Sequence, residues 1–325
     1  MTLGFIGLGK MGTRMVEKLL LDGHDVIAWN RSPEPVESIK NYVASRKQVK
    51  EHNTSYKLPT TMVGEFTGVQ SIENLVKTLK SPRVVWVMLP AGDPTDDALT
   101  EVIKYTKKGD IVIDGANSFY KDTQRRSEEL SEKGIRFLGI GVSGGIKAGE
   151  KGYPLMVGGD RSAYDEILPL LETLIKPGGS HEYFGEGGAG HFVKMVHNGI
   201  EYGMMQAIGE GFGVLEKAPY ALDLKKVSEL WQKNTIVTSF LMECARDALA
   251  KDVHLSKIDG VIDATGEAEW TVAQAKEEGV FAENIDQSLD FRRRSKTDEK
   301  VRSSFAARMV AALRHEFGGH KVKER

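Results

Sequence analysis

The chain has 325 residues, of which 40% are hydrophobic and 28% are charged. Because this length exceeds what one hydrophobic core usually serves, we expect two domains with a large buried interior. A disulfide-stabilised mini-protein and a disordered chain are both excluded. The 44 Lys and Arg residues nearly balance the 46 Asp and Glu residues, so the net charge of −2 gives no overall attraction to nucleic acid or to an anionic membrane.

The sequence also bears on the cellular compartment. Its single cysteine, Cys244, cannot form an internal disulfide, which suits a reducing environment. The longest dense apolar run, residues 84–89, is far too short to span a membrane. A glycine loop and charged residues begin within the first ten positions, which is unlike a secretion signal. We therefore expect a cytoplasmic protein that binds neither membranes nor nucleic acid.

The first half of the chain alternates short β-rich runs with helical stretches. The runs are apolar without alternation, which is typical of strands buried on both faces of a parallel sheet with helical crossovers. This pattern predicts an α/β, Rossmann-like, doubly wound and mostly parallel sheet. The predicted strands are Leu3–Gly7, Val26–Trp29, Val84–Leu89, Ile111–Asp114, Phe137–Ile140 and Leu155–Val157.

The character of the chain changes after two glycine-rich segments, 176–180 and 185–190. From Phe192 onward we find no convincing strand. We therefore place a domain boundary at Gly187: residues 1–187 form a dinucleotide-binding domain, and residues 188–325 form an all-helical substrate and dimerisation domain. The predicted helices of the second domain cover residues 190–217, 224–231, 238–250, 271–278 and 303–317.

Two segments do not fit this scheme clearly. Residues 47–61 are polar and have no clear period, which indicates a surface insertion or a long loop. The basic run Arg292-Arg-Arg-Ser-Lys296 by itself favours a solvated helix face over a binding site.

A glycine loop follows the first predicted strand and opens a helix. In Gly7-Leu-Gly-Lys10-Met11-Gly12, the first glycine permits a tight turn, Gly9 lets the backbone approach a pyrophosphate, and Gly12 allows close packing of helix and strand. The helix N-terminus supplies unpaired N–H groups for the anion. We interpret this loop as a dinucleotide site; the alternative is a strand–turn–helix without a ligand.

Cofactor choice is expected at the end of the second strand, where NAD enzymes commonly carry an acidic residue. This place reads Asn30-Arg31-Ser32 and has no acid. Since a guanidinium can pair with a 2′-phosphate, the segment favours NADP. NAD, held by looser contacts while Arg31 is merely exposed, remains the alternative.

One predicted helix carries a polar stripe on an otherwise apolar circumference. Lys194, His197, Asn198 and Glu201 recur at helical spacing and are surrounded by apolar residues. Burial lowers the pKa of a lysine, which can then act as a base, and raises that of a glutamate, which can then act as an acid. Beside a nicotinamide, this stripe suits oxidation of a secondary alcohol with Lys194 as the base. The alternative is an ordinary solvent-facing stripe.

Several motifs together give a specific resemblance. They are Asp114-Gly-Ala-Asn-Ser118, Val142-Ser-Gly-Gly145, 152–159 (Gly-Tyr-Pro-Leu-Met-Val-Gly-Gly), 190–202 (Gly-His-Phe-Val-Lys-Met-Val-His-Asn-Gly-Ile-Glu-Tyr) and 314–320 (Arg-His-Glu-Phe-Gly-Gly-His). With them the chain resembles decarboxylating 6-phosphogluconate dehydrogenase over nearly its whole length. It looks like the short form of that family, whose helical domain is about half as large as that of the long enzymes.

The resemblance implies oxidative decarboxylation of 6-phospho-D-gluconate to ribulose 5-phosphate and CO2 with NADP or NAD, a reaction of the pentose phosphate pathway. Lys194 would take the proton from the C3 hydroxyl, Asn198 would hold that oxygen, and Glu201 would protonate C1 of the enediol. The remaining implied contacts are Ser143, Gly144, Gly145 and His197 to the carboxylate region, Asn117 near the nicotinamide, and Tyr202 and Arg292 to the phosphate.

In the family, Arg314 and His320 come from a second subunit, which implies at least a homodimer, or a homotetramer, whose C-terminal tail completes the neighbouring site. No metal site is expected, since the ketone formed at C3 is itself the electron sink for decarboxylation and the histidines show no HExxH spacing. One departure is Asp263-Ala-Thr265-Gly, which stands where the long enzymes carry a phosphate-binding lysine. Two alternatives are a hydroxyisobutyrate-type 3-hydroxyacid dehydrogenase that releases no CO2, and a non-catalytic NADP-binding protein.

Overall fold

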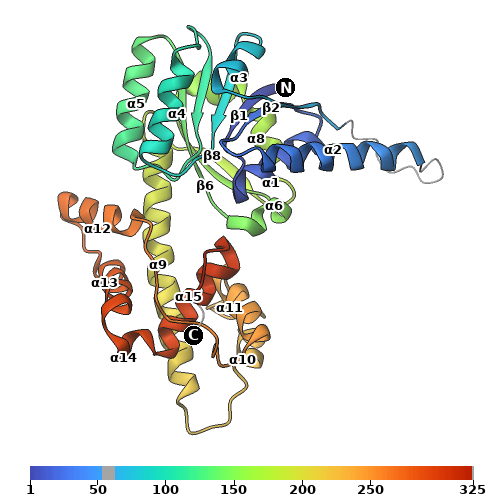
Figure 1. Ribbon diagram of the computed structural model, residues 1–325. Coiled ribbons are helices and arrows are strands. Elements are labelled where there is room, and N and C mark those ends of the chain that lie inside the picture. Colours follow the sequence, from blue (N-terminus) through green and yellow to red (C-terminus); the bar gives the residue numbers. More distant parts are fainter. Residues whose placement is uncertain (53–62, 324–325) are drawn as a thin grey trace. The chain divides into compact units, whose positions relative to one another are not determined.

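The computed structural model describes residues 1–52 and 63–323 (Figure 1). The chain divides into two compact units, Met1–Lys194 and Met195–Arg325, and each is described by itself. The division lies inside the first turns of a long helix, whereas the predicted boundary at residues 187 and 188 precedes that helix.

Within the described part of unit 1, eight strands form one sheet in the order β3-β2-β1-β4-β5-β6-β7-β8. Every neighbouring pair is parallel except β6 and β7, which are antiparallel. The predicted Rossmann-like, mostly parallel sheet is therefore confirmed. The strands are β1 (Thr2–Ile6), β2 (Asp25–Trp29), β3 (Phe66–Gly68), β4 (Val84–Val87), β5 (Ile111–Asp114), β6 (Arg136–Val142), β7 (Pro154–Gly159) and β8 (Ser180–Tyr183).

Helices cover both faces of this sheet (Figure 1). On β4, Trp86 belongs to the apolar core under α1, α2 and α8, and its neighbour Val87 belongs to the core under α3 and α4. Burial on both faces explains why the central strands are apolar without alternation. The helices are α1 (Lys10–Leu21), α2 (Glu34–His52), α3 (Ile72–Thr78), α4 (Asp93–Ile103), α5 (Tyr120–Glu132), α6 (Ala148–Lys151), α7 (Arg161–Glu166) and α8 (Leu168–Ile175).

Three local predictions for unit 1 need correction. The strands β3 and β8 were not predicted, because Phe66–Gly68 has only three residues and Ser180–Tyr183 is largely polar. Both are edge strands, which need no continuous apolar run. Residues 47–52, predicted as part of an insertion or loop, belong to α2, and residues 53–61 of that prediction lie outside the described residues.

Unit 2 is helical, and no strand occurs among its described residues up to 323. The helix α9 (Ala189–Glu216) begins in unit 1 and continues into unit 2. No helix in the described ranges is both long enough and apolar enough to cross a membrane. The other helices are α10 (Leu224–Trp231), α11 (Phe240–Lys251), α12 (Glu267–Glu278), α13 (Glu283–Thr297), α14 (Glu299–Arg302) and α15 (Phe305–Gly318).

Candidate active site

The carboxyl edge of the sheet gathers the predicted site residues of unit 1. Since β1, β2, β5 and β6 are parallel, the segments that follow them leave the sheet at the same edge. In doubly wound sheets this edge is where ligands bind. The segments begin with Gly7, Asn30, Gly115 and Ser143.

The glycine loop has the geometry that a bound pyrophosphate requires. Gly7 has φ +98°, and a Cβ there would lie 2.3 Å from the carbonyl oxygen of Met88. At Gly9 a Cβ would meet no described atom within 4 Å, so the space in front of α1 is open. At Gly12 a Cβ would lie 2.1 Å from the Gly7 carbonyl oxygen. The three glycines therefore fit the turn, the close ligand approach and the helix packing of a dinucleotide site.

The N-terminus of α1 is also suited to an anion. Within the described residues no side chain caps this helix, and its first turn contains no acidic residue. The N–H groups at a helix N-terminus can donate hydrogen bonds to phosphate oxygens. Lys10 is exposed in this turn, and Met11 is half-buried beside it.

Two side chains in the segment after β2, Asn30 and Arg31, differ in their contacts. The Asn30 side chain accepts a hydrogen bond from the Leu8 N–H at 2.8 Å and donates to the Ser32 carbonyl at 2.9 Å, so it holds the glycine loop against this segment. Arg31 is exposed and forms no hydrogen bond or ion pair with any residue that the structure describes. Its guanidinium is therefore available to a ligand.

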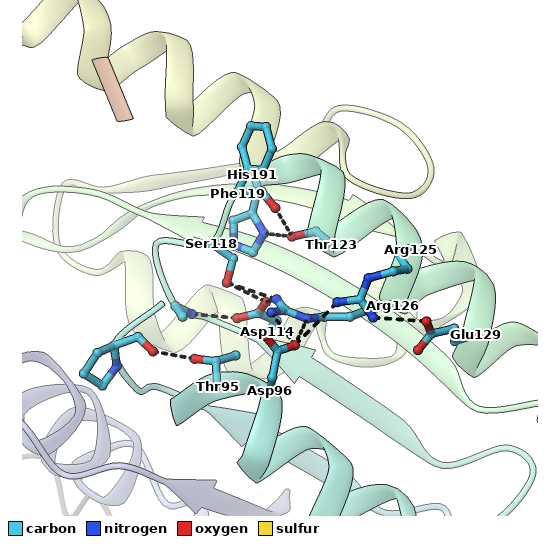
Figure 2. Close-up of polar contacts among 12 residues, drawn as sticks. Thr95, Asp96, Asp114, Ser118, Phe119, Thr123, Arg125, Arg126, Glu129 and His191 are labelled. Atoms are coloured by element: carbon cyan, nitrogen blue, oxygen red, sulfur yellow. Dashed lines mark hydrogen bonds and ion pairs between the residues drawn. The ribbon is translucent and has the colours of Figure 1, made fainter. Parts of the chain in front are cut away.

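A buried ionic network lies under the loop between β5 and α5 (Figure 2). The Asp114 carboxylate accepts from the Ala116 N–H at 3.0 Å, from the Ser118 hydroxyl at 2.8 Å and from Arg126 at 2.8 Å. Arg126 also pairs with Asp96 at 2.7 Å. Both carboxylate oxygens of Asp114 thereby accept hydrogen bonds, and the side chain is inaccessible to solvent. These hydrogen bonds hold the loop in place. Asn117, predicted near the nicotinamide, is exposed in this loop.

The turn after β6 carries the segment predicted to hold the substrate carboxylate. The Ser143 N–H donates to the Pro154 carbonyl at 3.0 Å. Gly144 and Gly145 have φ +90° and +56°, and a Cβ on Gly144 would lie 2.6 Å from that of Ala148. Only glycine adopts these angles without strain, so the sequence at 144 and 145 is dictated by the turn.

Lys194 is buried, with 7% of its surface exposed, and its stem lies on β6. A Cβ on Gly141 would be 2.4 Å from the Cβ of Lys194, and a Cβ on Gly190 would be 2.5 Å from the carbonyl oxygen of Gly139. The first turn of α9 therefore rests directly on the sheet, with no layer of side chains between them. The contact places the predicted base at the carboxyl end of β6.

His191 is a buried residue for which the sequence predicted no role. Its Nδ1 is hydrogen-bonded to the Thr123 hydroxyl at 2.7 Å, and both side chains are inaccessible to solvent. Burial lowers the pKa of His191, while the neighbouring Asp114 acts in the opposite direction and Arg126 lowers it further. The only signal in the sequence was its place one helical turn before Lys194.

The polar stripe of α9 continues in unit 2. Asn198 is buried, and its Oδ1 lies 3.0 Å from Nδ1 of His197. The same nitrogen lies 3.9 Å from a carboxylate oxygen of Glu201. The amide, imidazole and carboxyl groups are thus neighbours on one face of the helix. Lys194 lies on the same helix, three residues before His197 and four before Asn198.

The structure brings together two residues predicted to meet a phosphate. The Arg292 guanidinium lies 3.2 Å from the centre of the Tyr202 ring, and only 2% of Arg292 is exposed. Burial, with a contribution from the charge of Arg314, lowers the pKa of Arg292 to about 10. The interpretation of the whole basic run as a solvated face is wrong for Arg292. Arg293 and Arg294, on other sides of α13, are exposed.

Asp263 stands where the resemblance implied a phosphate-binding lysine, and the positions of its carboxylate and its carbonyl explain how an aspartate is accommodated there. The carboxylate pairs with Lys296 at 3.3 Å and is 71% exposed, while the Asp263 carbonyl accepts from Arg292 at 3.4 Å. The neighbouring Thr265 N–H donates to the Tyr202 hydroxyl at 3.3 Å. The negative charge is therefore neutralised by Lys296, and the backbone of this loop faces Arg292.

Arg314 is buried in unit 2 on α15, and its charge affects Arg292 of the same chain. Neither arginine forms an ion pair with a carboxylate among the described residues. The tail after Arg314 folds onto its own unit, since the His320 carbonyl lies 2.9 Å from Nδ1 of His315 and the Lys323 carbonyl accepts from Asp259 N–H at 2.8 Å. Glu201 and the buried Glu267 act on Arg292 only from beyond ion-pair distance. A buried guanidinium without a paired carboxylate is suited to an anionic ligand.

Family models match both parts of the chain. Residues 2–178 match the NAD binding domain of 6-phosphogluconate dehydrogenase, and residues 190–324 match the C-terminal domain of 6-phosphogluconate dehydrogenase. The Bacillus subtilis protein YqeC is 37% identical over 326 residues, with 100% of both chains covered.

Two further relatives have names that state a cofactor. The NAD(+)-dependent, decarboxylating 6-phosphogluconate dehydrogenase of Haloferax volcanii is 35% identical over 323 residues, which cover 99% of this chain and 98% of the relative. The 6-phosphogluconate dehydrogenase of Plasmodium falciparum, solved with its cofactor NADP+ and with 6-phosphogluconate, has a TM-score of 0.76 and 30% identity over 96% of this chain and 70% of that chain. The chain described here belongs to the 6-phosphogluconate dehydrogenase family.

Proposed function

We propose that this protein oxidises and decarboxylates 6-phospho-D-gluconate to ribulose 5-phosphate and CO2, with NADP as the hydride acceptor. The observation that carries the proposal is the buried Lys194 at the carboxyl edge of the sheet, on the same helix stripe as Asn198 and Glu201. Membership of the family supports the substrate class.

Each residue of the stripe has a distinct task in this proposal. The amine of Lys194 takes the proton of the C3 hydroxyl, and Asn198 donates a hydrogen bond to that oxygen. Bound at the glycine loop, NADP would supply the acceptor for the hydride that leaves C3. The resulting ketone accepts the electron pair when the C1–C2 bond breaks and CO2 departs. The ammonium of Lys194 stabilises the enolate oxygen, and Glu201 delivers the proton to carbon.

The remaining predicted residues hold the two ends of the substrate. Ser143, Gly144 and Gly145, with His197, bind the carboxylate region, and Tyr202 with Arg292 binds the phosphate. Arg292 is buried and has no carboxylate at ion-pair distance among the described residues, which supports an anionic ligand. A small unphosphorylated 3-hydroxyacid would leave Arg292 without an anion at ion-pair distance, which disfavours a hydroxyisobutyrate-type activity.

NADP is proposed over NAD because Arg31 is exposed and without a partner in the described part of the chain at the end of β2. A guanidinium there can pair with the 2′-phosphate. Gly7, Gly9, Gly12 and the first turn of α1 would hold the pyrophosphate, and Asn117 would lie at the nicotinamide.

We further propose that the enzyme is a short-form homodimer. Support comes from α9, where Ile200, Met204 and Val214 are 54%, 42% and 73% exposed on one side of the helix. Such an apolar stripe is typical of an interface with another chain. In the same proposal, Arg314 and His320 serve the site of the neighbouring subunit.

The test is an activity assay with a matched pair of lysine variants. NADPH and CO2 are measured with 6-phosphogluconate and, separately, with 3-hydroxyisobutyrate. We expect equal amounts of NADPH and CO2 from the phosphorylated acid. Lys194→Ala should lower kcat by ~10²–10⁴-fold with little change in the affinity for NADP, since it removes a general base. Lys217→Ala, just beyond the end of α9, should leave kcat unchanged.

Turnover of 3-hydroxyisobutyrate but not of 6-phosphogluconate would refute the proposed substrate. NADP binding without turnover of either acid would leave a dinucleotide-binding protein. Full activity of Lys194→Ala would show that another group is the base.

A further inference from the structure

One face of α5 holds the first turn of α9. The residues of α5 involved are three and four apart, so they project from the same side of the helix. Each contacts a residue in or just before the first turn of α9, and the whole arrangement belongs to unit 1. The contacts are an edge-to-face pair of Tyr120 with Phe192, the hydrogen bond of Thr123 with His191, and a hydrogen bond from the Gly188 N–H to the Gln124 side chain.

The Thr123–His191 hydrogen bond is the buried polar contact of this arrangement (Figure 2). A Cβ on Gly139 would lie 2.5 Å from the Thr123 methyl group and 3.0 Å from Nδ1 of His191. The glycine therefore leaves space for this pair and for nothing larger. In such a site a hydrogen bond has a strong directional preference, because no water can replace it.

His191 and Lys194 lie on the same side of the first turns of α9. The two residues are three apart on α9, so a rotation of the first turn moves both side chains together. The stem of Lys194 is already in contact with Gly141, and Gly190 approaches the backbone of β6. A loss of the His191 hydrogen bond would free this turn to rotate and would displace the amine of Lys194.

The same helix α5 also fixes the loop that carries Asn117. Arg126, one turn after Thr123, pairs with Asp114, whose carboxylate receives Ala116 N–H and the Ser118 hydroxyl. The loop and the first turn of α9 thus share one rigid support. Through Arg126, α5 holds the loop that carries Asn117, which is predicted near the nicotinamide. Through Thr123, it holds the turn of α9 that precedes Lys194, the proposed base.

We propose that His191, held by Thr123, is a positioning residue that sets the location of the Lys194 amine. The inference rests on the proposed role of Lys194 as the base. It adds a task for two residues outside the polar stripe, neither of which would contact the substrate.

The experiment compares two substitutions at Thr123. Thr123→Val has nearly the same shape but removes the hydroxyl, whereas Thr123→Ser keeps the hydroxyl. With 6-phosphogluconate and NADP, we expect Thr123→Val to lower kcat by ~10–100-fold, because small displacements of a catalytic group have effects of this size. Thr123→Ser should stay within about threefold of the unaltered enzyme, since the hydroxyl on which positioning depends remains.

Three readouts separate positioning from a general loss of structure. In Thr123→Val, the Kd of NADP should change less than kcat. The deuterium isotope effect with substrate labelled at C3 should rise, because the chemical step becomes slower. The double variant Thr123→Val/His191→Phe should be no worse than the poorer single variant, since both remove the same hydrogen bond.

A measurement without substrate distinguishes this inference from the proposed function. Lysines are ¹³C-dimethylated, and the NMR signal of Lys194 is assigned by its loss in Lys194→Arg. We expect the titration of that signal to shift in Thr123→Val and not in Thr123→Ser. An unchanged titration in Thr123→Val, or a kcat like that of the unaltered enzyme, would overturn the positioning role even if 6-phosphogluconate is turned over. Absence of turnover by the unaltered enzyme, with a shifted titration, would count against the proposed reaction alone.

Discussion

Arg31 is the side chain on which the cofactor preference depends most directly. It is exposed after β2, with no partner in the described part of the chain. A charge-assisted hydrogen bond to the 2′-phosphate contributes roughly 1.5–3 kcal/mol, so Arg31→Ala should weaken NADP binding on the order of 10–100-fold. NAD binding should change little. Dissociation constants for both dinucleotides, with Arg46→Ala on α2 as a control for lost charge, measure this; equal weakening of both would contradict a role at the 2′-phosphate.

His191 predicts a pH dependence of stability. Burial lowers its pKa in the folded protein, with Asp114 and Arg126 as the neighbouring charges, while the unfolded chain has the ordinary value of about 6.5. The unfolded state therefore binds more protons below about pH 6.5, and stability falls as the pH decreases through this window. Replacing the imidazole by a group that does not titrate there should make the decrease smaller.

The check is the melting temperature of His191→Gln at about pH 7.5 and about pH 5.5, the two sides of the window. The loss between these values should be smaller than in the unaltered protein. It should not vanish, because burial also lowers the pKa of His24. His254→Gln, at an exposed position, is the control. An unchanged loss in His191→Gln would exclude His191 as a source of the acid sensitivity.

At the scale of elements, periodicity predicted most helices and the central strands, but not what each face meets. The helix 224–231 has the predicted bounds, and α9 begins and ends within one residue of them. The helix α13 was suggested only by its basic run. On that helix Arg292 points into the core while Arg293 does not, because adjacent residues project about 100° apart. Charge composition carries no information about that choice.

The contact between β6 and α9 gives a prediction about an element rather than a side chain. In Gly141→Ala, the new methyl group would lie 2.4 Å from the Cβ of Lys194, so the helix turn must shift. We expect a loss of ~1–3 kcal/mol in the free energy of unfolding, which is usual for overpacking. The kcat should fall by at least about tenfold, because the base moves.

The control for this change is Gly178→Ala. Its Cβ would meet only the Lys151 carbonyl, at 3.3 Å, among the described atoms. Thermal unfolding and steady-state kinetics of both variants are measured together. If Gly141→Ala keeps its full kcat while losing stability, the packing of β6 on α9 does not govern catalysis.

At the scale of the whole molecule, large exposed hydrophobic residues are concentrated in unit 2. If the exposed apolar stripe of α9, formed by Ile200, Met204 and Val214, is the dimer interface, Met204→Glu places a charge in that interface without a counter-charge. We expect sedimentation velocity to show a dimer for the unaltered protein and a monomer for this variant. Val280→Glu, also in unit 2, should remain dimeric. A dimeric Met204→Glu variant would place the interface elsewhere or show that the stripe is not buried.

The origin of Arg314 in each site is tested by mixing inactive subunits. Lys194→Ala and Arg314→Ala chains are unfolded together, refolded and assayed. If Arg314 serves the neighbouring subunit, a mixed dimer contains one site in which both Lys194 and Arg314 are intact. About half of the dimers are mixed, and each has one working site of two. Activity should therefore reach about a quarter of the unaltered level. If Arg314 serves its own chain, the mixture stays inactive.

The sequence by itself determined the sheet type, the helical second unit, the glycine loop and the family, because each rests on local spacing or on motifs. Tertiary structure alone decided which polar groups are buried. It placed Arg292 against Tyr202, turned the Asp263 carboxylate toward Lys296, and joined His191 to Thr123. These outcomes depend on contacts between residues distant along the chain, where desolvation and not residue type sets the energy of a charge.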